Sequence, residues 1–164
     1  MYVLIVRHGQ AGSREEFART GQPDDLRPLT ESGARKIHRI ARGLRRIVPR
    51  IDVLATSPLT RARQTAEILG EAYGIDPVDA NELVPDASFA QFARWAKSID
   101  ASQLAIVGHE PHLSALVAWL VSKDGSASLV LKKGGACMIE FDGAPRRGTG
   151  ALRWLMTPGA LRRL

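Results

Sequence analysis

Three short runs of apolar residues constrain the fold of this chain more than any other feature. They lie at residues 2–6, 53–55 and 104–107. Continuous apolar runs of this length are typical of strands that are buried on both faces, as in parallel sheets. Helical patterns separate the runs, and strands that alternate with helices form a mostly parallel sheet covered on both faces. The sequence therefore predicts an α/β fold.

A long helical pattern follows each of the first two runs. The first begins after Thr30, the expected N-cap, and ends at Pro49. The second has Ser57 as its expected N-cap and Pro58 at its first helical position, and it ends at Gly74. In both, apolar residues recur with helical spacing, so we expect both helices to pack on the sheet.

The rest of the chain predicts loops and shorter elements. Polar, glycine- and proline-containing stretches at residues 11–28 and 75–87 indicate irregular structure. The other expected elements are helices at residues 89–96 and 113–121 and strands at residues 130–131, 137–141 and 152–156. A turn rich in glycine and proline separates the last two strands, so we expect them to pair as a hairpin.

Length and cysteine content limit the kind of protein this is. A chain of 164 residues buries roughly two thirds of its unfolded surface in a single core, so we expect one domain at residues 1–164. No run approaches the roughly 18 apolar residues of a membrane span. The single cysteine, Cys137, excludes an internal disulfide and fits a reducing compartment. We therefore expect a cytoplasmic protein with no membrane segment.

The chain is basic, with a net charge of +6 and a pI of about 10.1. Much of this charge lies in the helix after Thr30 and in the C-terminal tail. Such runs are most often solvated helix faces, although they also suit an acidic or phosphorylated partner. Nucleic-acid binding is not favoured, because no aromatic residues are interleaved with the basic ones.

Polar residues of the types that bind ligands or take part in catalysis follow each of the three central runs. In sheets of this kind, ligands bind beyond the carboxyl ends of the strands. Arg7 and His8 follow the first run, Ser57 and Arg61 the second, and His109 the third. Arginines and helix N-termini both attract anions, so the expected ligand at this edge is a phosphoryl group.

The two histidines have different expected roles. His8 lies among arginines, whose like charge disfavours its imidazolium form, so it is expected to be neutral and able to attack phosphorus. His109 could donate a hydrogen bond to a phosphoryl oxygen whose charge grows in the transition state. Each residue taken alone also fits an ordinary loop position. The sequence has no HExxH motif, no Walker loop and no G-x-S-x-G. A metal site and a hydrolase with a serine nucleophile are therefore less favoured than a phosphoryl-binding site.

Four segments of the chain together resemble the histidine phosphatase superfamily. Val-Arg-His-Gly at residues 6–9, Thr-Ser-Pro with Arg-Ala-Arg-Gln-Thr-Ala at residues 56–66, and Val-Gly-His at residues 107–109 are similar to its three signature segments. Residues 28–33 resemble its "PLT…G" stretch. The large insertions of mutases and acid phosphatases are missing, so the chain is most similar to the phosphohistidine phosphatase (SixA) branch.

The resemblance implies a fold and a role for each of the site residues. The fold is a three-layer α/β/α sandwich with a mostly parallel central sheet, like that of phosphoglycerate mutases. His8 would be the nucleophile that becomes phosphorylated, and Arg7, Arg61 and His109 would form the phosphate pocket, with Ser57 beside them. The resemblance also implies that no metal and no organic cofactor is needed.

The proton donor is the one role without a clear residue. Larger relatives have a glutamate donor after the helix that matches the one carrying Arg61, and only Glu82 is roughly placed for this role here; it also fits a solvated loop position. Imidazole leaves more readily than an alkoxide, so a phosphohistidine substrate depends less on an acid. We therefore expect a phosphohistidine phosphatase acting on a phosphorylated protein, such as a phosphotransfer protein. The alternatives are a phosphatase for a small phosphomonoester and an idle phosphoprotein-binding module.

Overall fold

The three apolar runs form adjacent parallel strands at the centre of a six-stranded sheet. The computed structural model describes residues 1–164. Strand β1 (Tyr2–Arg7) and strand β2 (Val53–Thr56) lie on either side of β4 (Gln103–Gly108). All three strands therefore end at the same edge of the sheet, as the sequence predicts.

The remaining strands extend the sheet on both sides. Strand β3 (Val78–Asp79), in a segment expected to be irregular, pairs parallel to β2. Beyond β1 lie β5 (Ala136–Glu140) and β6 (Ala151–Met156), in the order β3-β2-β4-β1-β5-β6. The pairs β1–β5 and β5–β6 are antiparallel, so β5 alone runs against the other strands. The expected hairpin and the mostly parallel sheet are confirmed.

The strand expected at residues 130–131 does not form. Val130 is 71% exposed, and the backbone of Leu131 is used by other partners. The Leu131 carbonyl accepts a hydrogen bond from Arg7 Nη1 at 2.7 Å, and its N–H donates to Ser114 Oγ at 3.4 Å. This segment therefore supports Arg7 in place of joining the sheet.

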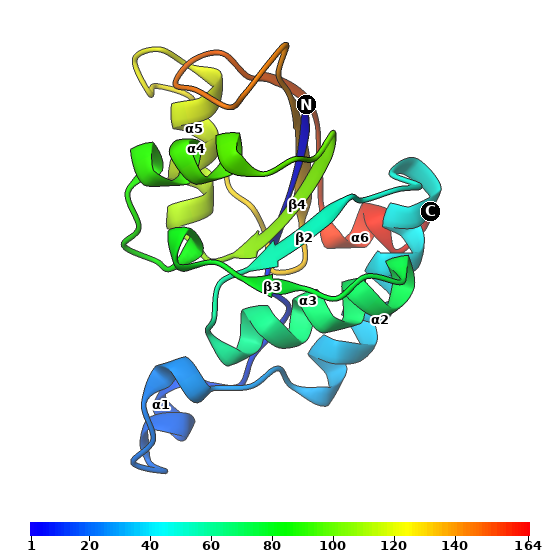
Figure 1. Ribbon diagram of the computed structural model, residues 1–164. Coiled ribbons are helices and arrows are strands. Elements are labelled where there is room, and N and C mark those ends of the chain that lie inside the picture. The colour runs from blue at the N-terminus through cyan, green and yellow to red at the C-terminus, as the bar shows by residue number, and fades with distance from the viewer.

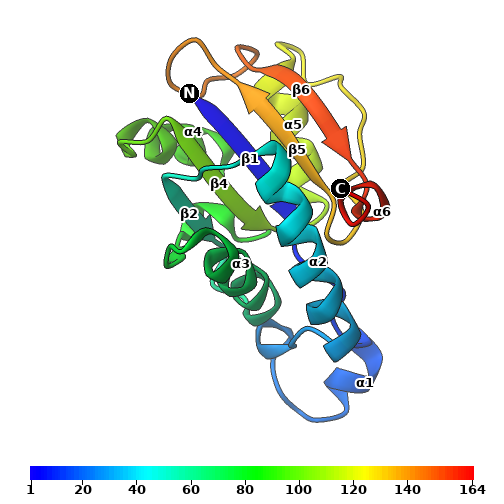
Figure 2. The same cartoon turned by 90° about the vertical axis from the view of Figure 1, so that its right-hand side faces the viewer.

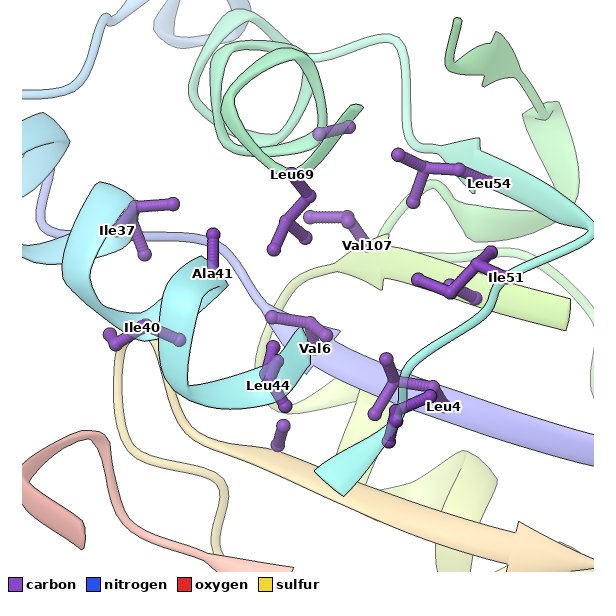
Figure 3. Close-up of a cluster of buried hydrophobic side chains, with 14 of the residues drawn as sticks. Leu4, Val6, Ile37, Ile40, Ala41, Leu44, Ile51, Leu54, Leu69 and Val107 are labelled. Atoms are coloured by element: carbon purple, nitrogen blue, oxygen red, sulfur yellow. The ribbon is translucent and has the colours of Figure 1, made fainter. Parts of the chain in front are cut away.

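Helices cover both faces of the sheet and make the structure three-layered (Figures 1 and 2). Helices α2 (Glu31–Ile47), α3 (Thr60–Tyr73) and α6 (Pro158–Leu161) lie on one face, and α4 (Phe89–Ser98) and α5 (His112–Val121) lie on the other. Side chains alternate along a strand, so each strand supplies two cores. Leu4 and Val6 pack under α2 and α3 (Figure 3), whereas Val3 and Ile5 pack under α4 and α5. None of the helices is long and apolar enough to cross a membrane.

The helix ends agree with the sequence at α2 and differ at α3. Thr30 caps α2, because its Oγ1 accepts a hydrogen bond from the Gly33 N–H at 2.9 Å. Helix α3, in contrast, begins at Thr60, and its N-cap residue, Leu59, makes no side-chain capping bond. The expected cap Ser57 lies before the helix, where its hydroxyl contacts His109. Gly74, with φ 71°, ends α3 as expected.

The segment between β1 and α2 extends away from the sheet at the end where β1 stops (Figure 1). It contains the short helix α1 (Arg14–Ala18) and the 3₁₀ turn η1 (Asp24–Leu26). A bridge between Ala11 and Leu29 closes its base. A second 3₁₀ turn, η2 (Asn81–Leu83), lies between β3 and α4.

Candidate active site

The edge where β1, β2 and β4 end opens into a cavity of about 650 Å³. The cations around it come from β1, α3, the segment between β1 and α2, and the turn before β5. They are Arg7, Arg14, Arg27, Arg61 and Lys133. The one acidic side chain in the lining is Glu110. A concave site with this charge balance is suited to an anion.

His8 lies at the cavity with one ring nitrogen fixed. Its side chain is buried, with the residue 6% exposed, and its Nδ1 lies 2.7 Å from the Gly9 carbonyl oxygen. A carbonyl oxygen only accepts hydrogen bonds, so Nδ1 is the protonated nitrogen. Gly9 is held in turn by its N–H, which donates to Thr65 Oγ1 at 3.0 Å. Nε2 of His8 therefore carries the free lone pair that a nucleophile needs.

Burial is the main reason why His8 is neutral. It lowers the pKa of His8 to about 4, and the positive charges of Arg61, Arg7 and Lys133 add to this, while the hydrogen bond to Gly9 opposes it. The charge argument made from the sequence therefore gives the right direction through the smaller cause. At neutral pH, His8 holds no proton on Nε2.

His109 faces His8 and is oriented by Ser57. The two imidazole ring centres are 5.0 Å apart, and His109 Nε2 lies 2.9 Å from Ser57 Oγ. Ser57 Oγ accepts from the Leu59 N–H at 3.4 Å, so its own proton is free to be donated to His109 Nε2. With Ser57 as the donor, neutral His109 carries its proton on Nδ1, which is buried and has no partner in the protein.

The pKa of His109 is lowered to about 3, first by burial and then by His8 and Arg61. His109 is therefore a neutral hydrogen-bond donor at physiological pH. A neutral imidazole that donates a hydrogen bond from Nδ1 can stabilise a phosphoryl oxygen while its own charge stays unchanged.

Arg7 and Arg61 are each held at one end and free at another. Arg7 Nη1 donates to the Leu131 carbonyl at 2.7 Å, and Arg61 Nη1 donates to the Asp24 carbonyl at 2.9 Å. The Nε of each guanidinium group is buried without a partner. Buried donors are rarely left unpaired, and both arginines line the cavity, so an anion bound in the cavity is the partner that we expect for these guanidinium groups.

Asp24 connects Arg61 to the segment between β1 and α2. Its carboxylate accepts from Arg27 Nε at 2.7 Å and lies 3.4 Å from Arg61 Nη1. The hydrogen bond from Arg27 and the charges of both arginines hold the pKa of Asp24 below its usual range. Arg27 Nη1 also donates to the Gly12 carbonyl at 2.8 Å. The segment is thus tied to the cavity by a small ionic network.

The structure brings together most of the residues that the sequence singles out. Arg7, His8, Arg61 and His109 line the cavity, and Ser57 reaches it through His109. Glu82 does not line the cavity: it lies half-buried in η2.

Sequence reasoning missed Arg27, Lys133 and Glu110, which all line the cavity. For Glu110, a signal existed, because it directly follows His109 at a strand end. Arg27 and Lys133 are brought in by loops, and no local pattern marks them. No three histidine, cysteine, aspartate or glutamate side chains are grouped as ligands of a metal ion would be.

Comparison with known proteins gives a consistent result. A sequence model of the histidine phosphatase superfamily (branch 1) matches residues 3–93. The chain is 34% identical over 139 residues to an uncharacterized protein of Picosynechococcus sp., and the match covers 82% of each chain. It is 27% identical over 164 residues to phosphohistidine phosphatase SixA of Escherichia coli, covering 96% of this chain and 94% of that protein.

The fold agrees with these matches. The structure of the protein histidine phosphatase SixA in complex with tungstate matches with a TM-score of 0.84 and 25% identity, over 98% of this chain and 99% of that one. The predicted phosphoglycerate mutase-like α/β/α sandwich is confirmed. The family model covers more than half of the chain and includes Arg7, His8 and Arg61. The chain therefore belongs to the histidine phosphatase superfamily.

Proposed function

We propose that this SixA-like phosphatase removes the phosphoryl group from a phosphohistidine on a protein, through a phosphorylated His8. The observation that carries the proposal is the state of His8, a buried neutral imidazole with its lone pair on Nε2 among unpaired guanidinium donors. The name of the relative SixA supports the choice of substrate.

In the first step, His8 Nε2 forms a bond to phosphorus while the bond from phosphorus to the substrate nitrogen breaks. The electron pair of the broken bond stays on the leaving imidazole. If the other ring nitrogen of the substrate carries a proton, the leaving group is a neutral imidazole, and no further proton is required. Phosphorylated His8 carries a positive ring, which its hydrogen bond from Nδ1 to the Gly9 carbonyl stabilises.

During the transfer, charge on the phosphoryl oxygens is met by donors that are already in position. Arg7 and Arg61 offer their buried Nε–H groups, and His109 offers Nδ1–H. Their hydrogen bonds to Leu131, Asp24 and Ser57 fix these side chains before substrate binds. Donors oriented in advance in a buried site are the most effective stabilisers of a transition state.

In the second step, water forms a bond to phosphorus and the bond to His8 Nε2 breaks. The products are neutral His8 and dihydrogen phosphate, so atoms and charge balance. No metal ion enters either step, and we propose that activity is unaffected by chelators. We also propose that the protein is cytoplasmic.

The distribution of carboxylates favours phosphohistidine over a phosphate ester. An alkoxide leaving group requires an acid, which contributes on the order of 10²–10⁴ in rate. Glu82 does not line the cavity, and Glu110 is the single carboxylate that does. If the enzyme acts on a small phosphomonoester, we propose Glu110 as the acid to test first and Glu82 as the second.

The test is a side-by-side turnover assay with a histidine-phosphorylated protein and an aryl phosphate, in the presence of chelator. Wild type is compared with His8→Ala and with His38→Ala, an exposed histidine on α2. We expect phosphohistidine to be preferred and its hydrolysis to be lost only with His8. A preference for the ester, lost in Glu110→Gln, supports the alternative, and binding of the phosphoprotein without turnover of either substrate supports the idle module.

A further inference from the structure

A second, smaller hollow lies next to the catalytic cavity. Its volume is about 150 Å³, and Lys133 lines both it and the cavity. Lys36 and Arg162 complete its set of charged residues, and no acidic side chain lines it. Gly9 and Gln10, which directly follow His8, form part of its lining. The hollow is thus a basic extension of the site that holds His8.

Three segments far apart in sequence place these cations together. Lys36 lies on α2, Lys133 in the turn before β5, and Arg162 directly after α6. Helix α6 lies beside α2 (Figure 2). The Leu161 carbonyl lies so close to Gly43 that no side chain fits there. The C-terminal residues are therefore held beside α2 by backbone packing.

The turn that carries Lys133 is fixed to the end of β1. The Gly134 N–H donates to the carbonyls of Arg7 and His8, at 3.1 Å each. Gly134 has φ 76°, and a Cβ there would lie 2.8 Å from Ile40 Cδ1 on α2. The backbone of the turn is thus set between β1 and α2, and Lys133 is held at the boundary of the two hollows.

The charges in the smaller hollow are not balanced within the protein. Lys36, Lys133 and Arg162 form no ion pair, and Lys36 Nζ contacts only the side-chain oxygen of Gln10, at 3.2 Å. Lys36 and Lys133 are exposed to solvent. Unpaired cations around a small concave site attract a carboxylate, and such contacts determine partner choice and association rate.

We propose that this hollow binds an acidic side chain of the phosphorylated protein substrate, close to the phosphorylated residue. The proposal rests on the proposed function, because a phosphoryl group carried on a protein brings its neighbouring side chains to the rim of the cavity. The two hollows share Lys133, so a carboxylate a few residues from the phosphohistidine lies within reach of the smaller one. A substrate rich in glutamate or aspartate around its phosphohistidine is the partner that fits.

The test uses two synthetic phosphohistidine peptides, one flanked by glutamates and one by glutamines. Enzyme variants are Lys36→Glu/Arg162→Glu and a control, Arg146→Glu/Arg147→Glu, with the same change in net charge. Arg146 and Arg147 are exposed in the β5–β6 turn, at the opposite end of the sheet. Lys133 is left unchanged because it lines the catalytic cavity.

We expect wild type to favour the glutamate peptide by about tenfold in kcat/KM, through KM. Lys36→Glu/Arg162→Glu removes this preference with kcat retained, and the control keeps it. An equal rate on both peptides, or an equal loss in the control, overturns the proposal.

Phosphotyrosine peptides with the same flanks, and binding of fluorescent peptides, separate the two proposals. If only the phosphotyrosine peptides are hydrolysed, the phosphohistidine function is rejected. The preference for the glutamate peptide over the glutamine peptide then still tests whether the hollow binds an acidic side chain. If no peptide is hydrolysed, the affinities of the enzyme for the glutamate and glutamine peptides are compared instead. Equal binding of these two peptides again overturns the proposal.

Discussion

The catalytic cavity and the basic hollow beside it are both lined by cations, but they hold them in different ways. In the cavity, Arg7 and Arg61 are anchored by hydrogen bonds to backbone carbonyls, and Arg61 is only 4% exposed. In the hollow, Lys36 is exposed and unpaired, and so is Lys133, which lines both spaces. Buried, oriented charges act strongly on bond making, whereas exposed charges act weakly and are screened by salt. The cavity should therefore control kcat, and the hollow KM.

The strongest way to break this comparison is to remove His8, the proposed nucleophile. His8→Ala is expected to lower kcat by at least about 10⁴-fold, because no other group in the cavity replaces its Nε2. Steady-state turnover and detection of an acid-labile phosphoryl-enzyme measure this. His38→Ala is the control, and a phosphoryl-enzyme that persists in His8→Ala would contradict the mechanism.

Arg61→Lys tests whether orientation matters beyond charge. We expect kcat to fall by about 10²–10³-fold, since lysine keeps the charge but loses the bond to the Asp24 carbonyl and the Nε–H donor. Arg63→Lys, on a half-buried arginine two positions away that pairs with Glu67 and Asp79 and does not line the cavity, serves as control. Equal activity of Arg61→Lys and wild type would show that a point charge is sufficient.

Ser57→Ala tests the positioning of His109. The hydrogen bond to Nε2 is lost, and we expect kcat to fall about tenfold with KM little changed. Ser98→Ala, in α4, is the matched control on an exposed serine. A change in KM alone would place Ser57 in substrate binding.

The pH dependence of stability tests the burial of the two histidines. Their pKa values in the folded protein, about 4 for His8 and about 3 for His109, lie below the usual 6.5. The unfolded chain then binds more protons than the folded one, so stability is full above pH about 6.5 and falls as the pH drops toward 4 and 3. Denaturant unfolding at several pH values measures this slope. His109→Asn should reduce the slope, and an unchanged slope would contradict it.

Salt gives the smallest expected effect. Raising the ionic strength from about 0.05 to 0.5 M should lower kcat/KM for a glutamate-flanked phosphohistidine peptide a few-fold, because it screens the exposed lysines. Turnover of an aryl phosphate under the same conditions should change less. Parallel losses for both substrates would show that salt acts on the cavity itself.

The sequence predicts those parts of the site that lie at strand ends. Arg7, His8 and His109 are each adjacent to an apolar run, so the topology of a parallel sheet is enough to bring them together. The prediction of Ser57 as the N-cap of α3 is wrong: its hydroxyl does accept from the Leu59 N–H, but the helix begins only at Thr60, and the contact of Ser57 with His109 joins residues that no local pattern connects.

Residues that reach the site through loops could not be predicted. Lys133 depends on how the turn at Gly134 packs against Ile40, and Arg27 depends on its bond to Asp24. The strand expected at residues 130–131 fails for a similar reason, since Arg7 takes the Leu131 carbonyl. These contacts join residues that are distant in sequence, so no periodic pattern in the sequence indicates them.

The neutral state of both histidines has a consequence for the charge balance of the cavity. With His8 and His109 uncharged, Arg7 and Arg61 together supply two positive charges, which equal the two negative charges of a phosphoryl dianion. Of the three other cations around the cavity, Arg14, Arg27 and Lys133, two are offset by the carboxylates of Glu110 and Asp24, and one positive charge is left over. With a phosphoryl dianion bound, the site is therefore within about one charge of electroneutral, and the protein's own cations suffice to offset the charge of a phosphoryl group there.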